Sequence, residues 1–449
     1  MKRKIYDRLL EWKRNEARES ALLIDGARRV GKSYIAEEFA KNEYRSYLMI
    51  DFAKAPSEIK ALFENYQDKL DRLFLKLSEY YGVRLHVGET LFIFDEVQKC
   101  PKAREAIKPL VADGRYDFLE TGSLVSIDEN VHDIVIPSEE TRVKMHPMDF
   151  EEFLWARGDD MTMDAIRSHY SEKEPMGALL HRKALDLFRE YMVVGGMPQA
   201  VAEFVKSSNL GRVDAVKRRI LKLYREDIRK HAGKYALKTE LVFDGMAAQL
   251  SKHEKKFRLA ALGANARMRE YEDAFLWLKE AMVVNVCYRS TEPNIGLGIN
   301  ADHATLKCYA ADTGLLVSLA FSGPQIVSEQ VHKRILFDSL ELNKGMFVEN
   351  IVAQMLTAAG HELYFFSASP VEKSDRMEID FLVPVASIGR RHNIRPIEVK
   401  SSRRYDHVSL DKFTAKYRRS LAVPVVLHAK DVMEKGGLTY LPLYMASCL

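Results

Sequence analysis

The sequence predicts an α/β protein whose N-terminal part contains a mainly parallel sheet. Short apolar runs alternate there with longer stretches of helical periodicity, as in sheets whose strands are joined by crossover helices. A glycine-containing loop follows the first of these runs, residues 21–24, and two carboxylates follow the run at 90–94. Polar residues directly after buried parallel strands lie at the carboxyl edge of the sheet, where ligands bind. We therefore expect a binding site along that edge.

The loop after the first strand has the sequence G-A-R-R-V-G-K-S, which fits the phosphate-binding pattern G-x-x-x-x-G-K-[ST]. A lead-in helix over residues 4–16 precedes the strand, and a helix over 34–40 follows the loop. The backbone N–H groups of such a loop point at phosphates, and the helix N-terminus adds its positive dipole end. Lys32 then reaches the β- and γ-phosphates, and the Ser33 hydroxyl binds Mg²⁺. The predicted nucleotide-binding residues are Gly26, Ala27, Arg28, Arg29, Val30, Gly31, Lys32 and Ser33.

The two carboxylates after the strand at 90–94 complete the predicted nucleotide site. Before them the chain forms a strand over 47–51 and helices over 56–64 and 69–81. Asp95 is expected to hold the Mg²⁺ shell together with Ser33, and Glu96 is the candidate general base for the attacking water. The predicted ligands are therefore ATP and Mg²⁺.

Two further strands add candidates at the same edge. After a helix over residues 104–111, a strand at 116–120 runs into Thr121 and Ser123. These hydroxyls are candidates for sensing the γ-phosphate, although Thr, Gly and Ser are also ordinary residues of a strand-to-turn exit. A short strand over residues 142–145 follows.

These motifs, with the T-R…H-P-M-D-F-E-E-F stretch at 141–153 and G-G-M-P-Q-A at 195–200, resemble a known family. The sequence is similar to bacterial and archaeal AAA+-type P-loop ATPases that carry a C-terminal domain of unknown function, over essentially the whole chain. In such relatives the basic position before the P-L-x-F-x-E-F stretch usually follows a glycine, whereas here it is Thr141-Arg142. The resemblance makes Arg142 a candidate for an arginine that reaches phosphate in cis or from a neighbouring copy in a homo-oligomer. The alternative is a strand-edge arginine.

The middle of the chain contains two segments that suggest nucleic acid. A helix over residues 213–229 is rich in Lys and Arg, which indicates either a solvated basic face or a nucleic-acid contact. A basic stretch at 253–258, a short helix at 259–262, a longer helix at 267–283 and a strand at 284–288 are typical of a winged helix. Winged helices contact either nucleic acids or proteins.

The C-terminal part has an αβββ order with acidic residues at fixed places. A helix over residues 344–359 contains Glu349, and the strands that follow, at 363–366, 378–383 and 395–400, contain Asp380, Glu398 and Lys400. This order resembles the restriction-endonuclease-like, PD-(D/E)xK, fold. Glu398 and Lys400 share one side of a strand, so the acids can hold Mg²⁺ or Mn²⁺ while the lysine activates a water. Cleavage stays open, because many such domains bind without cutting.

Length and composition bound the remaining possibilities. At 449 residues the chain is too long for a single core. We expect an AAA+-like domain over 1–160, a helical and winged-helix region over 161–300, and a restriction-endonuclease-like α/β domain over 301–449. Four scattered cysteines without a C-x-x-C pair, a charged N-terminus and the lack of an 18-residue apolar run favour a cytoplasmic protein that does not contact membranes.

Together these features predict an ATP-hydrolysing, AAA+-like ATPase. Its nucleotide state is expected to control a C-terminal domain that binds DNA or RNA and is a candidate nuclease. The alternative is a nucleotide-switched interaction protein whose nuclease-like domain is a catalytically silent scaffold. Net charge is only +4, so any nucleic-acid contact must come from local basic clusters.

Overall fold

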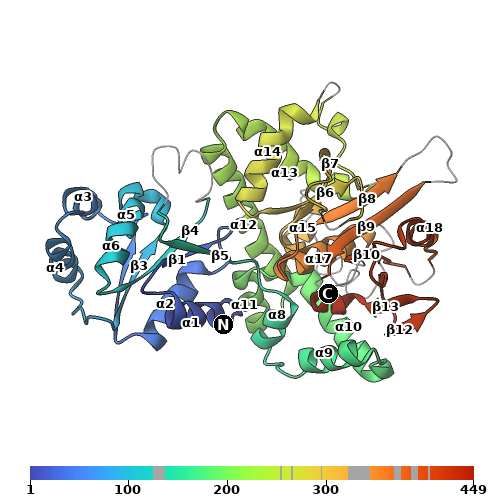
Figure 1. Ribbon diagram of the computed structural model, residues 1–449, viewed down its shortest axis with the longest axis horizontal. Coiled ribbons are helices and arrows are strands. Elements are labelled where there is room, and N and C mark those ends of the chain that lie inside the picture. Colours follow the sequence, from blue (N-terminus) through green and yellow to red (C-terminus); the bar gives the residue numbers. More distant parts are fainter. Residues whose placement is uncertain are drawn as a thin grey trace. The chain divides into compact units, whose positions relative to one another are not determined.

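The computed structural model describes residues 1–124, 137–252, 255–263, 266–294, 296–321, 344–368, 376–385, 393–402 and 405–449 (Figure 1). The chain separates into two compact units. The first contains Met1–His146 and Glu280–Met282, and the second contains Pro147–Lys279 and Val283–Leu449. The expected boundaries lay instead after residues 160 and 300. Strands on the two sides of residue 300 pair with each other, so both belong to one sheet.

The first unit is built on a five-stranded sheet with the order β2-β3-β4-β1-β5. All its pairings are parallel, which confirms the predicted parallel sheet. Its strands are β1 Ala21–Asp25, β2 Ser46–Asp51, β3 Thr90–Asp95, β4 Asp117–Gly122 and β5 Glu140–Lys144. Because β4 lies between β1 and β3, its carboxyl end is placed between the glycine-containing loop and the paired carboxylates.

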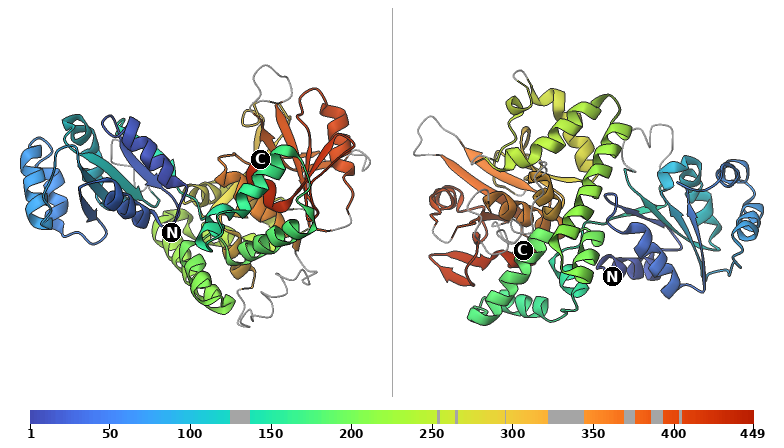
Figure 2. Two further views of the ribbon diagram at one scale, coloured as in Figure 1. Left: turned by 90° about the horizontal axis from the view of Figure 1, so that it is seen from below. Right: turned by 180° about the vertical axis from the view of Figure 1, so that it is seen from behind.

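Helices cover both faces of this sheet (Figures 1 and 2). Alternate strand residues such as Leu23, Phe92 and Phe118 form one buried face and pack against side chains of α3 to α6. Edge-to-face aromatic pairs, for example Phe63 with Phe94, add to this core. The helices are α1 Ile5–Asn15, α2 Lys32–Glu43, α3 Ser57–Asn65, α4 Leu70–Tyr81, α5 Pro101–Glu105 and α6 Ile107–Asp113.

The second unit contains an eight-stranded mixed sheet with the order β12-β13-β11-β10-β9-β8-β6-β7. Within it, β8, β9 and β10 are antiparallel neighbours and β11 runs parallel to β10. The chain order through this part is α17, β8, β9, β10, α18, β11. The bounds are β6 Val284–Ser290, β7 Ala301–Ala310, α17 Lys344–Ala358, β8 Tyr364–Ala368, β9 Met377–Pro384, β10 Ile394–Val399, α18 Val408–Tyr417, β11 Val425–His428, β12 Met433–Lys435 and β13 Leu438–Pro442.

The other helices of the second unit are α8 Phe150–Ala156, α9 Thr162–Glu172, α10 Gly177–Val194, α11 Pro198–Ser207, α12 Leu210–His231, α13 Ala236–Leu250, α14 Met268–Glu280 and α15 Thr313–Ala320. In the expected winged helix, residues 253–254 and 264–265 lie outside the described residues. The short helix is a 3₁₀ turn, Leu259–Ala261, and the strand expected as a wing, β6, pairs with β7 and β8 in the large sheet. Among the described residues, the strand expected as the wing therefore belongs to the large sheet. Within the part of the chain described, no helix meets the length and hydropathy needed to span a membrane.

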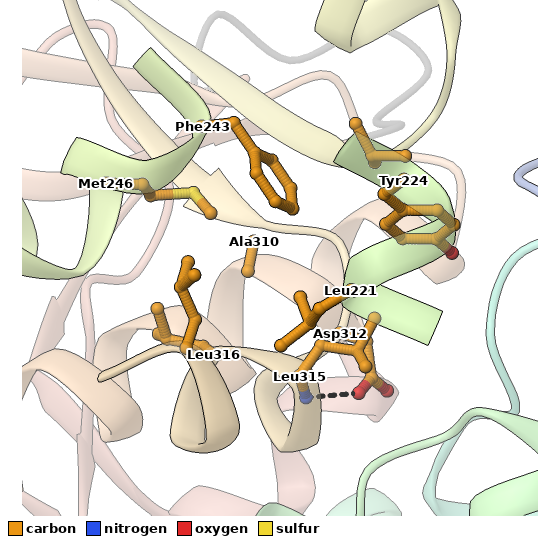
Figure 3. A pocket seen from close by; sticks show the side chains of 10 residues that line it. Leu221, Tyr224, Phe243, Met246, Ala310, Asp312, Leu315 and Leu316 are labelled. Atoms are coloured by element: carbon orange, nitrogen blue, oxygen red, sulfur yellow. Dashed lines mark hydrogen bonds between the residues drawn. The ribbon is translucent and has the colours of Figure 1, made fainter. Parts of the chain in front are cut away.

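The G-G-M-P-Q-A stretch packs against the segment that begins at Asp312. The Asp312 carboxylate accepts hydrogen bonds from the N–H of Leu315, at 2.8 Å, and from the N–H of Gly196, at 2.5 Å. Figure 3 shows this carboxylate at the rim of a small cavity that is otherwise lined by apolar and aromatic side chains. Both oxygens of Asp312 therefore serve the fold, since they cap α15 and tie it to the start of α11.

Replacing Gly314 with alanine is expected to destabilise the second unit by about 1–3 kcal/mol, the usual cost of overpacking. A Cβ at Gly314 would lie 2.6 Å from the Cα of Gly195 and closer still to the carbonyl oxygen of Val194, and neither backbone group can move freely. Thermal unfolding measures the effect. Gly245→Ala is the matched control, because its Cβ meets only the flexible end of Leu262 and alanine favours the helix interior. Equal stability of the two variants would contradict this packing argument.

Candidate nucleotide site

The glycine-containing loop holds Lys32 at the entrance of α2. Gly31 precedes this helix with φ of 100°, a conformation that favours glycine. The buried Lys32 ammonium donates to the carbonyl oxygens of Gly26 at 2.7 Å and Ala27 at 3.0 Å. Burial lowers the pKa of Lys32, and the nearby Glu96 carboxylate opposes that shift. The loop thus positions a cation where the phosphate chain of a nucleotide is expected.

The two predicted Mg²⁺ ligands lie together at the sheet edge. The Ser33 hydroxyl donates to Asp95 Oδ1 at 2.6 Å, and Thr121 donates to the same oxygen. Burial raises the pKa of Asp95, while these two hydrogen bonds stabilise its charged form. A hydroxyl and a carboxylate are the oxygen ligands that Mg²⁺ prefers, so the chemistry of these two residues fits the ion. Thr121 is thus hydrogen-bonded to Asp95, and its role in sensing the γ-phosphate stays a prediction.

Glu96 is held in an unusual backbone conformation beside this pair. Its φ of 53° and ψ of 49° lie in the left-handed region, which is uncommon for residues other than glycine and is associated with functional sites. Its carboxylate accepts hydrogen bonds from the Gln98 amide at 2.6 Å and from the Ser123 hydroxyl at 3.3 Å. The Glu96 N–H also donates to Thr121 Oγ1 at 3.4 Å. The carboxylate that was predicted to act as base is therefore oriented by side chains from two strand ends.

Arg142 lies on the edge strand β5, with its side chain one-third exposed. Its Nε donates to Glu140 Oε1 at 2.8 Å. Glu140 also forms a fully buried, two-point ion pair with Arg104, whose Nε and terminal nitrogen lie 2.8 and 2.9 Å from the carboxylate oxygens. The structure thus places Arg142 in an ion-pair group at the strand edge, and its contact with phosphate stays a prediction.

The candidate nuclease residues of the C-terminal part also lie close together, within the second unit. The register that pairs Ile397 with Phe381 places Glu398 beside Asp380 on neighbouring strands. Lys400 Nζ lies 2.7 Å from Glu398 Oε1. Burial and the Asp380 charge raise the pKa of Glu398 to about 8, against the effect of Lys400. Glu349 is buried in α17, where burial favours its neutral form but Lys255 and Lys307 lower its pKa to about 2.

The basic helix α12 is mostly engaged within its own unit. Lys217 is fully buried and donates to the carbonyl oxygen of Val193 at 2.7 Å. Four of its arginines pair with carboxylates, namely Arg212 with Glu203, Arg218 with Asp214, Arg225 with Asp244 and Arg229 with Glu240. Arg219, Lys222 and Lys230 are exposed. Arg212 and Arg229 are exposed too, but they pair with Glu203 and Glu240.

Comparison with protein families agrees with the geometry of the first unit. Residues 18–154 match an AAA domain family. This range contains the P-loop, the paired carboxylates and all five strands of the parallel sheet. Residues 18–154 are thus similar to an AAA domain in both sequence and site geometry. Residues 185–325 match a domain of unknown function (DUF8612), and residues 344–445 match another (DUF4143). No curated protein is significantly similar to the chain.

Several solved structures are distantly similar. The Walker-type ATPase PABY2304 of Pyrococcus abyssi is 16% identical, with 71% of this chain and 95% of that chain covered and a TM-score of 0.41. The Aeropyrum pernix ORC2 protein is 13% identical, with 75% and 93% covered and a TM-score of 0.33. The Aeropyrum pernix ORC1 protein, solved in complex with DNA, is 13% identical, with 72% and 93% covered and a TM-score of 0.28. These TM-scores are too low for the likeness to bear on this chain's function.

Sequence reasoning missed three side chains that act on the candidate sites. Gln98 orients Glu96, and it stands two residues after the base in the F-D-E-V-Q stretch, where its polar character was the available signal. Arg104 pairs with Glu140, which only the contact between α5 and β5 reveals. Lys307 is buried against the C-terminal acids, and a lone charge among apolar residues of a strand was its signal.

Proposed function

We propose that this chain binds ATP with Mg²⁺ at the P-loop, hydrolyses it with Glu96 as general base, and uses the nucleotide state to control binding by its second unit. The convergence of Ser33, Asp95 and Glu96 beside Lys32 carries the proposal. Ser33 Oγ and Asp95 Oδ1 are 2.6 Å apart, and Glu96 is the next residue after Asp95, with Gln98 and Ser123 on its carboxylate.

Each residue has a defined task in this proposal. Lys32 leaves the loop carbonyl oxygens for the β- and γ-phosphate oxygens, and Ser33 and Asp95 hold the hydrated Mg²⁺. The bound ion supplies charge neutralisation for the phosphate oxygens. Glu96 takes a proton from the water whose oxygen attacks the γ-phosphorus, while ADP departs. Arg142 is proposed to add a further positive charge near the leaving group.

The proposed control of the second unit by the nucleotide rests on the short link between strand β5 and helix α8. Strand β5, which contains Arg142, ends at Lys144, and helix α8 of the second unit begins at Phe150. A nucleotide-dependent shift of β5 thus reaches α8 through a short connection. The C-terminal carboxylates are paired with lysines, which favours a binding module over a nuclease.

The test is ATP turnover measured with and without duplex DNA, together with DNA affinity in the presence of ADP or a non-hydrolysable ATP analogue. We expect turnover that is lost in Lys32→Ala and kept in Lys41→Ala, an exposed lysine of the same helix. We also expect the DNA affinity to differ between the two nucleotide states at low salt, where exposed Arg219, Lys222 and Lys230 contribute most.

Three other outcomes separate the proposal from its rival. Turnover in Lys32→Ala equal to wild type would contradict the assigned P-loop role. Tight ATP binding without turnover would support the nucleotide-switched interaction protein. No DNA binding at low salt in either nucleotide state would remove nucleic acid as the ligand and leave a protein partner.

A further inference from the structure

Lys307 lies at the centre of the C-terminal carboxylate group. It is on β7, its side chain is 1% exposed, and its ammonium nitrogen contacts three acids from two other elements. The distances are 3.2 Å to Glu349 Oε1 of α17, and 3.4 Å to both Glu378 Oε1 and Asp380 Oδ1 of β9. Three carboxylate oxygens therefore surround one point in the unit, and a cation of this chain occupies that point.

The geometry suits an ammonium and does not suit a divalent ion. An ammonium has three N–H donors. The Lys307 ammonium donates hydrogen bonds to Glu349 and Asp380 and forms an ion pair with Glu378. Mg²⁺ requires oxygens at about 2.0–2.1 Å in near-octahedral order. The oxygens here lie more than an ångström farther out, at 3.2 to 3.4 Å from the nitrogen. The Phe365 ring, with its centroid 5.1 Å from Nζ, provides a further favourable surface for an organic cation.

The remaining oxygens of the two central acids are also taken. Glu349 accepts a hydrogen bond from Tyr309 OH and pairs through Oε2 with Lys255. Asp380 Oδ2 accepts from the Val399 N–H at 2.9 Å. Within the described residues, no group of three or more His, Cys, Asp or Glu side chains is arranged to hold a metal ion. The oxygens of Glu349 and Asp380 thus face lysines, a tyrosine and a backbone N–H group. Glu398, the third predicted acid, pairs through Oε1 with Lys400, whereas its buried Oε2 accepts no hydrogen bond from the described residues.

We infer that Lys307, supported by Lys255, takes the place of the divalent ion predicted for Glu349, Asp380 and Glu398, and that this chain does not bind Mg²⁺ or Mn²⁺ there. A divalent ion would have to expel a buried ammonium, and a buried charge without its partners is strongly unfavourable. The site is therefore silent for metal-dependent cleavage and holds α17 against β7 and β9. This inference stands independently of the proposed ATP hydrolysis.

The test is Mn²⁺ binding by the nucleotide-free full-length protein, followed as loss of the electron paramagnetic resonance signal of free Mn²⁺. The wild type and Asp380→Asn are expected to bind the same number of ions per chain. Lys307→Ala is expected to bind one more ion, and Lys307→Ala/Asp380→Asn is expected to lose it. One additional Mn²⁺ in Lys307→Ala would show that the acids can bind the ion and that the Lys307 ammonium keeps it out.

Mn²⁺ bound by the wild type and lost in Asp380→Asn would overturn the inference. This comparison does not need the Lys307 variant, so it remains decisive if removal of the lysine prevents folding. Lys307→Ala/Glu378→Gln lowers the repulsion among the acids and serves as the second variant. If that variant folds, as circular dichroism reports, and binds no more Mn²⁺ than wild type, exclusion by Lys307 is also rejected.

Discussion

Replacing Glu96 with glutamine is expected to lower the ATP turnover number about 100-fold or more, since a general base typically contributes 10² to 10⁴ in rate. Nucleotide affinity is expected to stay close to wild type, because glutamine keeps the shape and an oxygen that can accept from Gln98 and Ser123. Steady-state turnover and binding of a fluorescent ATP analogue measure the two quantities separately. The variant should therefore accumulate in the ATP-bound state.

The matched control for this prediction is Glu89→Gln. Glu89 is an exposed acid of the same unit that pairs with Arg45, so its replacement should leave turnover unchanged. Gln98→Ala is expected to lower turnover less than Glu96→Gln, because it removes an orienting hydrogen bond while leaving the base in place. Wild-type turnover in Glu96→Gln would show that another group accepts the proton.

Replacing Arg104 with methionine is expected to destabilise the P-loop unit by about 3–5 kcal/mol, the usual cost of breaking a buried ion pair on one side. Arg104 and Glu140 have side chains 0% and 1% exposed. The variant leaves the Glu140 carboxylate buried beside Glu120. Burial and the charge of Glu140 already raise the pKa of Glu120 well above its usual range. The remaining partner of Glu140, Arg142, is partly exposed and compensates only in part.

Chemical denaturation at several pH values tests this second prediction. Burial raises the pKa of Glu140, but its pairing with Arg104 outweighs this effect and lowers the pKa below its usual value. The ion pair therefore stabilises the folded wild type fully at pH values above the usual pKa of a glutamate, and this stabilisation is lost as the pH falls through the lowered pKa. Without Arg104 the same carboxyl is expected to have a raised pKa. The loss of unfolding free energy in Arg104→Met, relative to wild type, should therefore be largest near pH 7 and smaller toward pH 4.

A double variant supplies the control for the ion-pair explanation. Arg104→Met/Glu140→Gln removes the buried charge together with its partner, and it is expected to recover at least half of the lost stability. If the double variant is as unstable as Arg104→Met, or if the deficit does not depend on pH, loss of packing rather than an unpaired charge would be the cause.

Much of the nucleotide site follows from local sequence. A strand, a glycine-containing loop and a helix are adjacent in the chain, so Lys32 and Ser33 are positioned by their own neighbours. Asp95 and Glu96 likewise follow their strand directly. The meeting of Ser33 with Asp95 required one further assumption, a parallel sheet, and alternating strands and helices predict that sheet.

The sequence by itself thus determined the P-loop, the acidic strand end and the αβββ order of the C-terminal part, because these depend on residues a few positions apart. Tertiary structure alone decided that β6 joins the large sheet, that Lys217 is buried, and that Lys307 faces Glu349 and Asp380. These features depend on which distant strands and helices become neighbours. The partner of a buried charge is set by that three-dimensional pairing, and hydrophobic periodicity carries no information about it.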